Sequence, residues 1–289
     1  MCERVPRSFP HGGMTPGRTQ KGQGSATLGH PRVHLRRTDS TNERARALAV
    51  KGSPHGTLVS AAEQTEGRGR QGRAWVAPAA SALLCSLVLR DPPPLLSLIA
   101  GVAVCDAVGN DARVKWPNDV VLELPAADTT VVAATPGRPP HESPTGPALA
   151  KLAGILVEGR PQEGWAVLGI GVNVAVRLEQ LPADVRAGAA SLELPTSAIE
   201  PLLEGLLEEL ERRLSQPVES VLKAWRARDC LRGRDISWGS TGLHHPGGHD
   251  KPRIAHGRAS GIDDEGRLIV ELADGSTTWL DAGEIHLRG

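Results

Sequence analysis

The sequence predicts an α+β fold in which a first domain mixes helices with strands and a small all-β domain follows it. The first observation is that strand-length apolar runs alternate with helical apolar periodicity between residues 31 and 229. The second is that helical periodicity stops after Arg228, where short strands and tight turns occupy residues 230–289. A length of 289 residues suits one large domain or two unequal ones, which agrees with this division.

Residues 1–30 are predicted to form a disordered N-terminal extension. They contain six Gly and three Pro but few apolar side chains, so they cannot bury enough surface to offset the entropy of ordering. Order is expected from Val33, and Ser40 with Glu43 has the Ser-x-x-Glu spacing of a capping box that starts a helix. The elements expected next are a strand at 57–62, a Gly/Arg loop at 67–73, a strand at 82–89 and a buried helix at 94–108.

The rest of the first domain is predicted to contain four strands, one inserted loop and two helices. Residues 125–150 hold six prolines and no apolar periodicity, which predicts an inserted surface loop. Leucines at helical spacing predict an amphipathic helix over 199–214, and a second helix is expected from Val218. The strands are expected at 113–116, 120–124, 152–158 and 165–174, and those of the small domain at 235–238, 255–262, 267–272, 277–280 and 284–287.

Charge and cysteine content narrow the class of protein. Lys plus Arg and Asp plus Glu both number 33, and this zero net charge argues against a broad basic surface for nucleic acid. The four cysteines are far apart and form no Cys-x-x-Cys pair, so no zinc or redox motif is recognised. No apolar run is long enough to span a bilayer and the N-terminus lacks a signal-peptide core, which predicts a cytoplasmic protein without a membrane partner.

A His-rich stretch over residues 242–256 leaves two interpretations open. It lies among Gly and Pro and lacks the fixed ligand spacing of a metal site, so a solvated hairpin loop is favoured over metal binding. The histidines concerned are His244, His245, His249 and His256.

The Gly/Arg loop is the most informative stretch of the sequence. Three arginines and three glycines share the seven residues from Gly67 to Arg73. Glycine lets the backbone approach a ligand closely, and arginine presents a planar, permanently charged fork to carboxylate or phosphate. The loop therefore predicts a site for an anionic ligand. A disordered Arg/Gly segment that binds RNA is the alternative, which a single short copy disfavours.

Three further motifs carry polar groups on short strands. Lys115–Asp119 places a cation, an amide and a carboxylate around one turn. Lys151–Glu158 opens an apolar strand with a lysine, and Gly154 lets another group approach its backbone. Gly169–Val174 combines two glycines and Asn173 in an otherwise apolar run. Each motif alone is equally compatible with a turn, a strand start or a packed strand.

Taken together, five motifs resemble the biotin–protein ligases, and the resemblance covers about residues 33–289. It implies a class II synthetase-like catalytic domain (31–229) with a mixed, mainly antiparallel sheet and packed helices. Residues 257–263 and 283–288 resemble the family's small C-terminal SH3-like β-barrel, here residues 230–289. The five motifs are Ser40-Thr41-Asn42, Gly67–Trp75, Lys115–Asp119, Lys151–Glu158 and Gly169–Asn173.

The resemblance implies an ATP-dependent ligase. Such enzymes join biotin to ATP, release pyrophosphate, keep biotinyl-5′-adenylate bound and transfer biotin to one lysine of a biotin carboxyl-carrier protein, a subunit of acetyl-CoA carboxylase. ATP and biotin are thus the expected substrates, with Mg²⁺ as the metal. The predicted protein is monofunctional and has no nucleic-acid partner, because no helix-turn-helix pattern precedes residue 31. A monomer and a homodimer remain equally open.

The resemblance also implies roles for individual residues. Arg70, Lys115 and Lys151 are the predicted catalytic residues, and Asp119 is the predicted ligand of Mg²⁺. The predicted biotin-binding residues are Ser40, Thr41, Asn42, Gln64, Gly67, Arg68, Gly69, Arg70, Lys151 and Gly154. The predicted ATP-binding residues are Arg70, Arg73, Lys115, Asn118, Asn173 and Arg288.

Two alternatives and two departures from the family pattern accompany this prediction. A bifunctional ligase and transcriptional repressor is disfavoured by the lack of a DNA-binding motif, and a lipoate–protein ligase by the biotin-type Gly-Arg-Gly-Arg loop. Thr65-Glu66 stands where many relatives have Gln-Ala, so a carboxylate lies beside the loop. The expected adenylate-covering segment, 177–190, has no aromatic residue, and adenine is expected to pack on Leu178 or Leu181.

Overall fold

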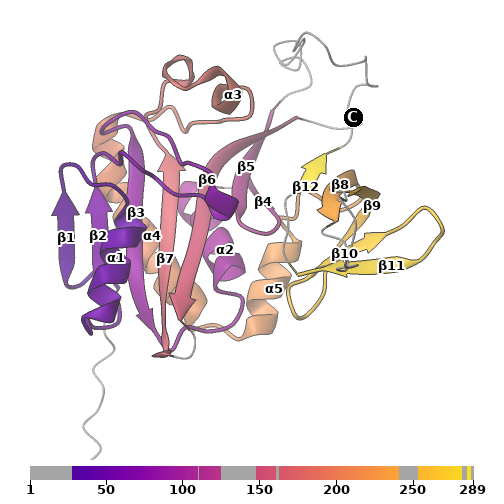
Figure 1. Ribbon diagram of the computed structural model, residues 1–289, viewed down its shortest axis with the longest axis horizontal. Helices are drawn as coiled ribbons and strands as arrows, with labels where there is room; N and C mark the ends of the chain where they lie inside the picture. The colour runs from indigo at the N-terminus through magenta and orange to yellow at the C-terminus, as the bar shows by residue number, and fades with distance from the viewer. Residues whose placement is uncertain are drawn as a thin grey trace, which may run out of the picture.

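The computed structural model has two sheets, and helices cover both faces of the larger one (Figure 1). This arrangement confirms the predicted α+β class, with the helix-containing part first and an all-β part after it. The residues described are 28–109, 111–124, 148–160, 163–240, 253–281 and 285–287.

The larger sheet has seven strands in the order β1-β2-β3-β7-β6-β5-β4. β1 and β2 are parallel and every other neighbouring pair is antiparallel, as the mixed, mainly antiparallel prediction requires. Its central strands, β3 and β7, are buried along almost their whole length because helices cover both faces. The bounds are β1 Arg32–Leu35, β2 Leu58–Ala61, β3 Ala82–Arg90, β4 Ala112–Lys115, β5 Asp119–Leu124, β6 Ala148–Arg160 and β7 Trp165–Asn173.

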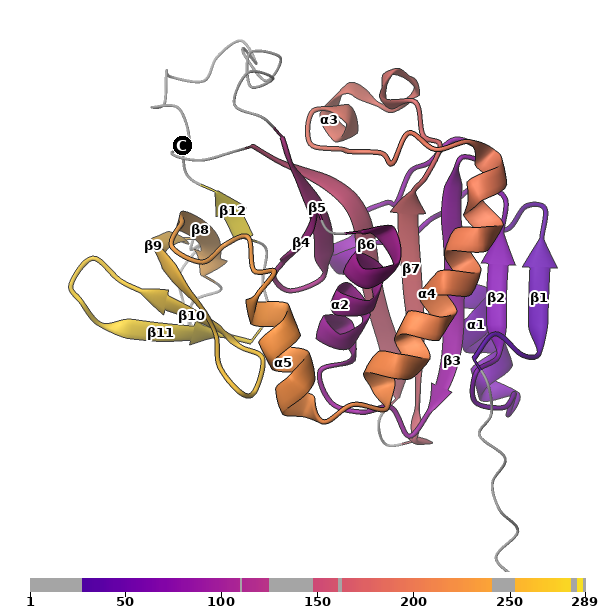
Figure 2. The ribbon, with the colours of Figure 1, turned by 180° about the vertical axis from the view of Figure 1, so that it is seen from behind.

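One helix packs on one face of this sheet and three pack on the other (Figures 1 and 2). α1 (Thr41–Val50) contacts β2, β3 and β7. On the opposite face α2 (Leu96–Val108) contacts β4, β5 and β6, α4 (Ile199–Leu214) contacts β3, and both α4 and α5 (Val218–Arg226) pack against α2. α2 is almost entirely apolar and is buried from Leu98 to Cys105, while α4 buries a stripe of leucines together with Arg213. Among the described residues, no helix is long and apolar enough to cross a membrane.

The capping box predicted at the start of α1 does not form. Ser40 is the N-cap residue, but its side chain makes no capping hydrogen bond. Glu43 instead forms ion pairs with Arg46 and Arg68, at 2.7 and 3.1 Å. The spacing predicted the helix start correctly, because the backbone turns there, but the Ser40 side chain faces a cavity.

The C-terminal sheet is antiparallel, with strand order β11-β10-β9-β8-β12. All five strands coincide closely with those expected from the sequence. The segment that connects β7 to α4 contains a short helix, α3 (Ala183–Arg186), which lies beyond the end of β7, at the top of Figure 1. The strand bounds are β8 Asp235–Ser240, β9 Arg253–Ile262, β10 Leu268–Glu271, β11 Thr277–Leu280 and β12 Ile285–Leu287.

Two predicted boundaries shift. Residues 148–150 begin β6 and Ala150 is buried, so the insertion is shorter than the 125–150 predicted, and its remainder lies outside the described residues. Leu28 packs in the main core and its N–H donates to Glu211 at 2.5 Å, so ordered chain begins before Val33. Residues 1–27, and 241–252 of the His-rich stretch, lie outside the described ranges, while His256 lies on β9.

A buried carboxylate ties the three helices of the second face together. Asp106 on α2 accepts hydrogen bonds from Arg213 on α4, at 2.7 Å, and from Arg228 after α5, also at 2.7 Å. Its side chain is only 10% exposed, so these charges are poorly hydrated and depend on one another. The network fixes the chain where it leaves α5 for the C-terminal sheet.

Asp229 lies in that connection, and Asp229→Asn is expected to stabilise the protein at neutral pH. Burial raises the pKa of Asp229 to about 6, so folding above that pH buries a charge. Because this pKa exceeds the unfolded value of 3.8, stability falls as pH rises from about 4 to about 6 and stays low above it. An amide keeps an acceptor for the Leu231 N–H, so the expected gain is about 3 kcal/mol at pH 7 and close to none near pH 4.

Urea unfolding at several pH values measures this gain. Asp235→Asn is the control, because Asp235 is exposed on β8 and its replacement removes one charge without relieving burial; a change within about 0.5 kcal/mol is expected. A stabilisation by Asp229→Asn that is the same at pH 4 and pH 7 contradicts the assignment.

Candidate active site

A cavity lies between the centre of the larger sheet, the start of α1 and the Gly/Arg loop. β3 contributes Cys85 to its floor, and β6 and β7 contribute the residues around Gly154 and Gly171. Burial raises the pKa of the Cys85 thiol to about 12, so this group is neutral. The full lining is Ser40, Thr41, Asn42, Gln64, Arg68, Gly69, Arg70, Trp75, Cys85, Asn118, Lys151, Gly154, Ile155, Leu156, Gly169, Ile170 and Gly171.

Hydrogen bonds fix the polar side of this cavity. The backbone N–H and the hydroxyl of Thr41 donate to Gln64 Oε1 at 2.7 and 2.9 Å. The Ser86 hydroxyl lies 2.8 Å from Thr41 Oγ1 and 2.6 Å from Asn42 Oδ1. Ser86 is fully buried on β3 and was missed from the sequence, where it is one small polar residue inside an apolar strand. The polar wall is therefore held rigid before any ligand enters.

Glycines on β6 and β7 make room for two side chains. A Cβ at Gly169 would lie 1.9 Å from Asn42 Oδ1, so no side chain fits there. A Cβ at Gly171 or Gly154 would lie 2.6 or 2.9 Å from the Trp75 indole. Trp75 was not predicted as a site residue, although its place at the end of the Gly/Arg motif was a signal. Gly154, predicted to let another group approach its backbone, and Gly169 and Gly171, for which no role was predicted, thus make room for the side chains that shape the cavity.

Lys151 is placed by an irregularity in β6. Ala153 pairs with Val120 but Lys151 pairs with Val121, so one extra residue is accommodated next to Lys151. Its Nζ lies 2.7 Å from Asp119 Oδ1, an ion pair without hydrogen-bond geometry, and 5.6 Å from the centre of the Trp75 ring. The ammonium therefore stands between a carboxylate and an aromatic face.

Arg70 connects the Gly/Arg loop to the Lys115–Asp119 turn. Its Nη1 donates to Asn118 Oδ1 at 3.1 Å, and Asn118 Nδ2 donates to the backbone oxygen of Ile155 at 2.9 Å. Burial lowers the pKa of Arg70, and the nearby Asp119 opposes that shift. Arg68 is held on the other side of the loop by Glu43 at 3.1 Å and Glu158 at 3.8 Å.

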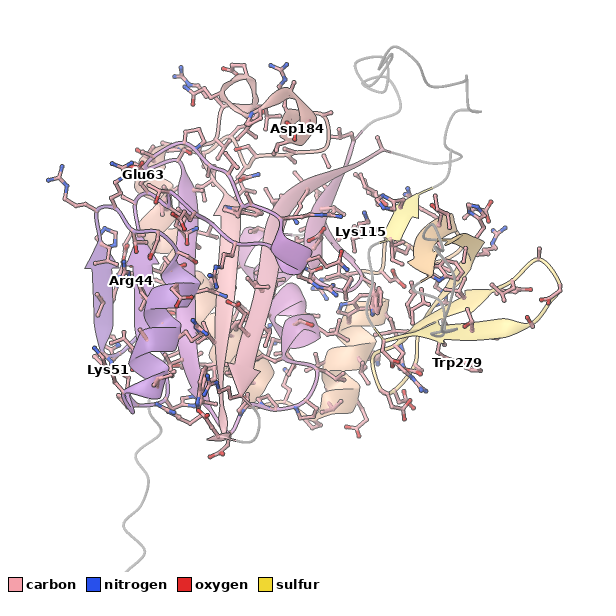
Figure 3. The ribbon with its side chains drawn as sticks, viewed as in Figure 1. Arg44, Lys51, Glu63, Lys115, Asp184 and Trp279 are labelled. Carbon is pink, nitrogen blue, oxygen red and sulfur yellow. The ribbon has the colours of Figure 1, made fainter. Side chains whose placement is uncertain are left out.

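A second cavity adjoins the first and is rich in cations. Lys115 lies here, between the larger sheet and the C-terminal strands (Figure 3). Burial lowers the pKa of Lys115 and Asp119 opposes the shift. Burial, with Lys115 and Arg73 nearby, also lowers the pKa of His286 on β12. The charged and polar lining consists of Arg70, Gln71, Arg73, Lys115, Asn118, Asp119, Lys151 and His286.

The structure brings most of the predicted residues into these two cavities, but not all. Gly67 lines an open groove on the outer side of the loop, and a Cβ there would lie 2.3 Å from the Trp75 carbonyl oxygen. Asn173 lines neither cavity: its Nδ2 donates to the Ala190 carbonyl at 2.9 Å, while its Oδ1 is buried without a partner. Arg288 lies outside the described residues, and His286, two positions earlier, was not predicted.

Comparisons with known proteins agree with this geometry. Residues 34–174 match the biotin/lipoate A/B protein ligase family, and residues 250–288 match the biotin protein ligase C-terminal domain. The chain is 35% identical to the biotin–[acetyl-CoA-carboxylase] ligase of Mycobacterium tuberculosis, over 87% of each protein. It is 30% identical to the bifunctional ligase/repressor BirA of Bacillus spizizenii, over 82% of this chain and 68% of that protein.

The fold is also that of a solved ligase. The biotin protein ligase of Aquifex aeolicus, in complex with biotin and ATP, superposes with a TM-score of 0.66 over 89% of this chain and 98% of that chain, at 22% identity. Within the biotin/lipoate ligases, the chain therefore belongs to the biotin–protein ligase family, and it is a ligase. The higher identity to a protein named for the ligase alone supports the monofunctional prediction over the bifunctional alternative.

Gly171→Ala is expected to damage the first cavity while leaving the fold intact. The new Cβ would meet the Trp75 indole at 2.6 Å, so the ring and the adjacent Lys151 must move. We expect biotin affinity, measured by calorimetry, to fall at least tenfold and the free energy of unfolding to fall by about 1–3 kcal/mol. Gly205→Ala on α4, where a Cβ meets nothing within 4 Å, is the control, with unchanged affinity expected. Unchanged biotin binding by Gly171→Ala would show that the packing of Trp75 against Gly171 does not shape the binding site.

Proposed function

We propose that this protein activates biotin with ATP to biotinyl-5′-adenylate and transfers the biotin to a lysine of a biotin carboxyl-carrier protein. The observation that carries the proposal is the junction of two cavities, one lined mainly by uncharged polar and apolar side chains and one where cationic side chains gather; Lys151, Arg70 and Asn118 line both. A small neutral ring system with one carboxylate suits the first cavity, and a polyphosphate suits the second. The names of the curated relatives and the ligands of the Aquifex complex support this assignment.

Biotin binding uses the hydrogen-bonded wall and the apolar floor of the first cavity. Ser40, Thr41 and Gln64 face the ureido ring, while Leu156 and Ile170 line the space for its apolar part. The biotin carboxylate lies toward Lys151, whose charge holds it for reaction.

The first chemical step is a displacement at phosphorus. A carboxylate oxygen of biotin bonds to the α-phosphorus of ATP, and the bond from that phosphorus to the bridging oxygen of pyrophosphate breaks. Arg70, Arg73 and Lys115 stabilise the charge of the transferring and leaving phosphates, and Lys151 that of the new acyl phosphate. No side chain forms a covalent intermediate.

A magnesium ion fits this arrangement only together with the nucleotide. The described part of the chain contains no cluster of three or more metal-binding side chains, and Asp119 is the carboxylate in the cationic cavity. Mg²⁺ commonly binds through one or two carboxylates, substrate phosphates and water, so one protein ligand is compatible with it. When bound, the ion neutralises phosphate charge.

We assign the adenine base to the side of Asn173, which lines neither cavity, so the 177–190 segment beside it must move to admit the base. The buried Oδ1 of Asn173 has no partner, and an acceptor left unpaired in this way suits the exocyclic amino group of adenine. Leu181 is buried in a cluster that includes Leu178 and Trp75, which provides apolar surface beside the base. Aliphatic side chains thus take the role that an aromatic ring would otherwise have.

In the second step the acceptor lysine attacks the carbonyl carbon of the adenylate. The amine, after losing its proton, forms the amide bond while the bond from the carbonyl carbon to AMP breaks and AMP leaves. The Gly/Arg loop limits access of water, which would otherwise hydrolyse the mixed anhydride.

Incubation with ATP, Mg²⁺, biotin and an apo carboxyl-carrier domain tests the proposal. We expect biotin on a single carrier lysine, detected by streptavidin and by a mass increase, and release of pyrophosphate and AMP. Replacing biotin with lipoate is the control and is expected to give no product. Modification by lipoate with none by biotin overturns the proposal.

Lys151→Ala is expected to abolish adenylate formation while the protein stays folded. The variant removes one of the two cations that line both cavities, and we expect biotin-dependent pyrophosphate release to fall by at least 100-fold. Lys223→Ala, an exposed lysine on α5, is the matched control with normal activity expected. Near-normal release by Lys151→Ala would remove this residue from the mechanism.

A further inference from the structure

The C-terminal sheet makes a directional contact with the Lys115–Asp119 turn. Trp116, in the middle of that turn, is only 2% exposed, and its indole Nε1–H donates to the backbone oxygen of Gly266 at 3.0 Å. Gly266 belongs to the turn between β9 and β10. Trp116 itself lines the cationic cavity, as do its neighbours Lys115 and Asn118, whereas Gly266 lines neither cavity, so the contact joins the cavity wall to a turn outside it.

Close packing fixes the acceptor. Gly266 has a φ of +77°, and a Cβ there would lie 2.6 Å from Leu95 Cδ2 and 2.8 Å from Leu98 Cδ1. Leu95, at the start of α2, itself has a φ of 60°, which costs energy for a leucine. The Gly266 backbone is thus pressed onto the start of α2, at a distance that no side chain would permit.

The turn that carries Gly266 is also braced from both sides. Asp263 Oδ1 accepts from the backbone N–H of Arg267 at 2.8 Å and of Glu265 at 3.1 Å. Arg226 on α5 donates to the carbonyl of Ile262 at 3.1 Å and to Asp264 at 2.7 Å. These contacts hold the Gly266 carbonyl in place independently of Trp116. The hydrogen bond therefore positions the Trp116 indole.

We propose that Trp116 is a positioning residue for the polyphosphate, through which the 263–267 turn of the C-terminal sheet aligns Lys115 and Asn118 in the cationic cavity. This inference rests on the proposed function. Lys115 precedes Trp116 directly and Asn118 follows two residues later, so a displaced indole moves both groups. Of the Lys115–Asp119 turn, only Asn118 lines the biotin cavity. ATP binding therefore depends on the hydrogen bond between Trp116 and Gly266 more strongly than biotin binding does.

Trp116→Phe tests the proposal, because it keeps an aromatic ring in the buried site and removes the N–H donor. Trp279→Phe is the matched control: Trp279 lies on β11 of the same sheet and is 50% exposed (Figure 3). The KM for ATP and kcat are measured by biotin-dependent pyrophosphate release on the full chain. The Kd for biotin without ATP and the thermal midpoint are measured in parallel.

For Trp116→Phe we expect the KM for ATP to rise about tenfold and the Kd for biotin to change less than twofold, the size of effect that one lost buried hydrogen bond produces. Trp279→Phe is expected to leave all four quantities unchanged. A lower thermal midpoint with an unchanged KM for ATP overturns the proposal, since it assigns the contact to stability alone. An equal loss of ATP and biotin affinity also overturns it. Failure of the wild-type chain to form the adenylate refutes the proposed function instead.

Discussion

The candidate active site depends on how the indole ring of Trp75 packs against the larger sheet. Trp75 lies against Gly154 and Gly171 on adjacent strands, where a single methyl group on either would overlap it, and Lys151 stands over its face. Trp75 ends the Gly/Arg motif, so its packing on the sheet anchors that end of the loop next to Lys151. Position of the loop, orientation of the lysine and width of the cavity are thus set by one packing contact.

The order of strands in the larger sheet explains why the site has two cavities, one lined mainly by uncharged side chains and one rich in cations. β6 and β7 are central and bring Gly154, Gly169 and Gly171 next to the polar start of α1. β4 and β5 form the edge, where the Lys115–Asp119 turn meets the C-terminal sheet. The Gly/Arg loop spans both, since Arg68 points to α1 while Arg70 reaches Asn118. An anion bound on one side is consequently close to the substrate on the other.

The spacing of apolar residues and the turn-forming residues between them predicted almost every helix and strand, because these signals are local in the sequence. The family resemblance predicted about half of the residues that line the two cavities. Ser86 and Trp75 were missed because their roles arise from contacts across strands, which no local pattern encodes. The same reason explains Glu43, whose capping spacing was real but whose carboxylate pairs with Arg68 instead of the helix start. Trp116 and Gly266 are 150 positions apart, and only the fold brings them together.

Arg68 has a consequence for how firmly the Gly/Arg loop is held. Its guanidinium is 47% exposed, and Glu43 and Glu158 are 30% and 32% exposed, so water and salt ions reach all three. Ion pairs of this kind contribute about 0–1 kcal/mol and weaken as ionic strength increases. The ion pairs on the outer side of the loop are therefore worth little more than thermal energy, whereas on its inner side the partly buried Trp75 indole packs against Gly154 and Gly171. The weaker attachment of the loop therefore faces solvent, and the hydrogen-bonded wall formed by Thr41 and Gln64 takes no part in it.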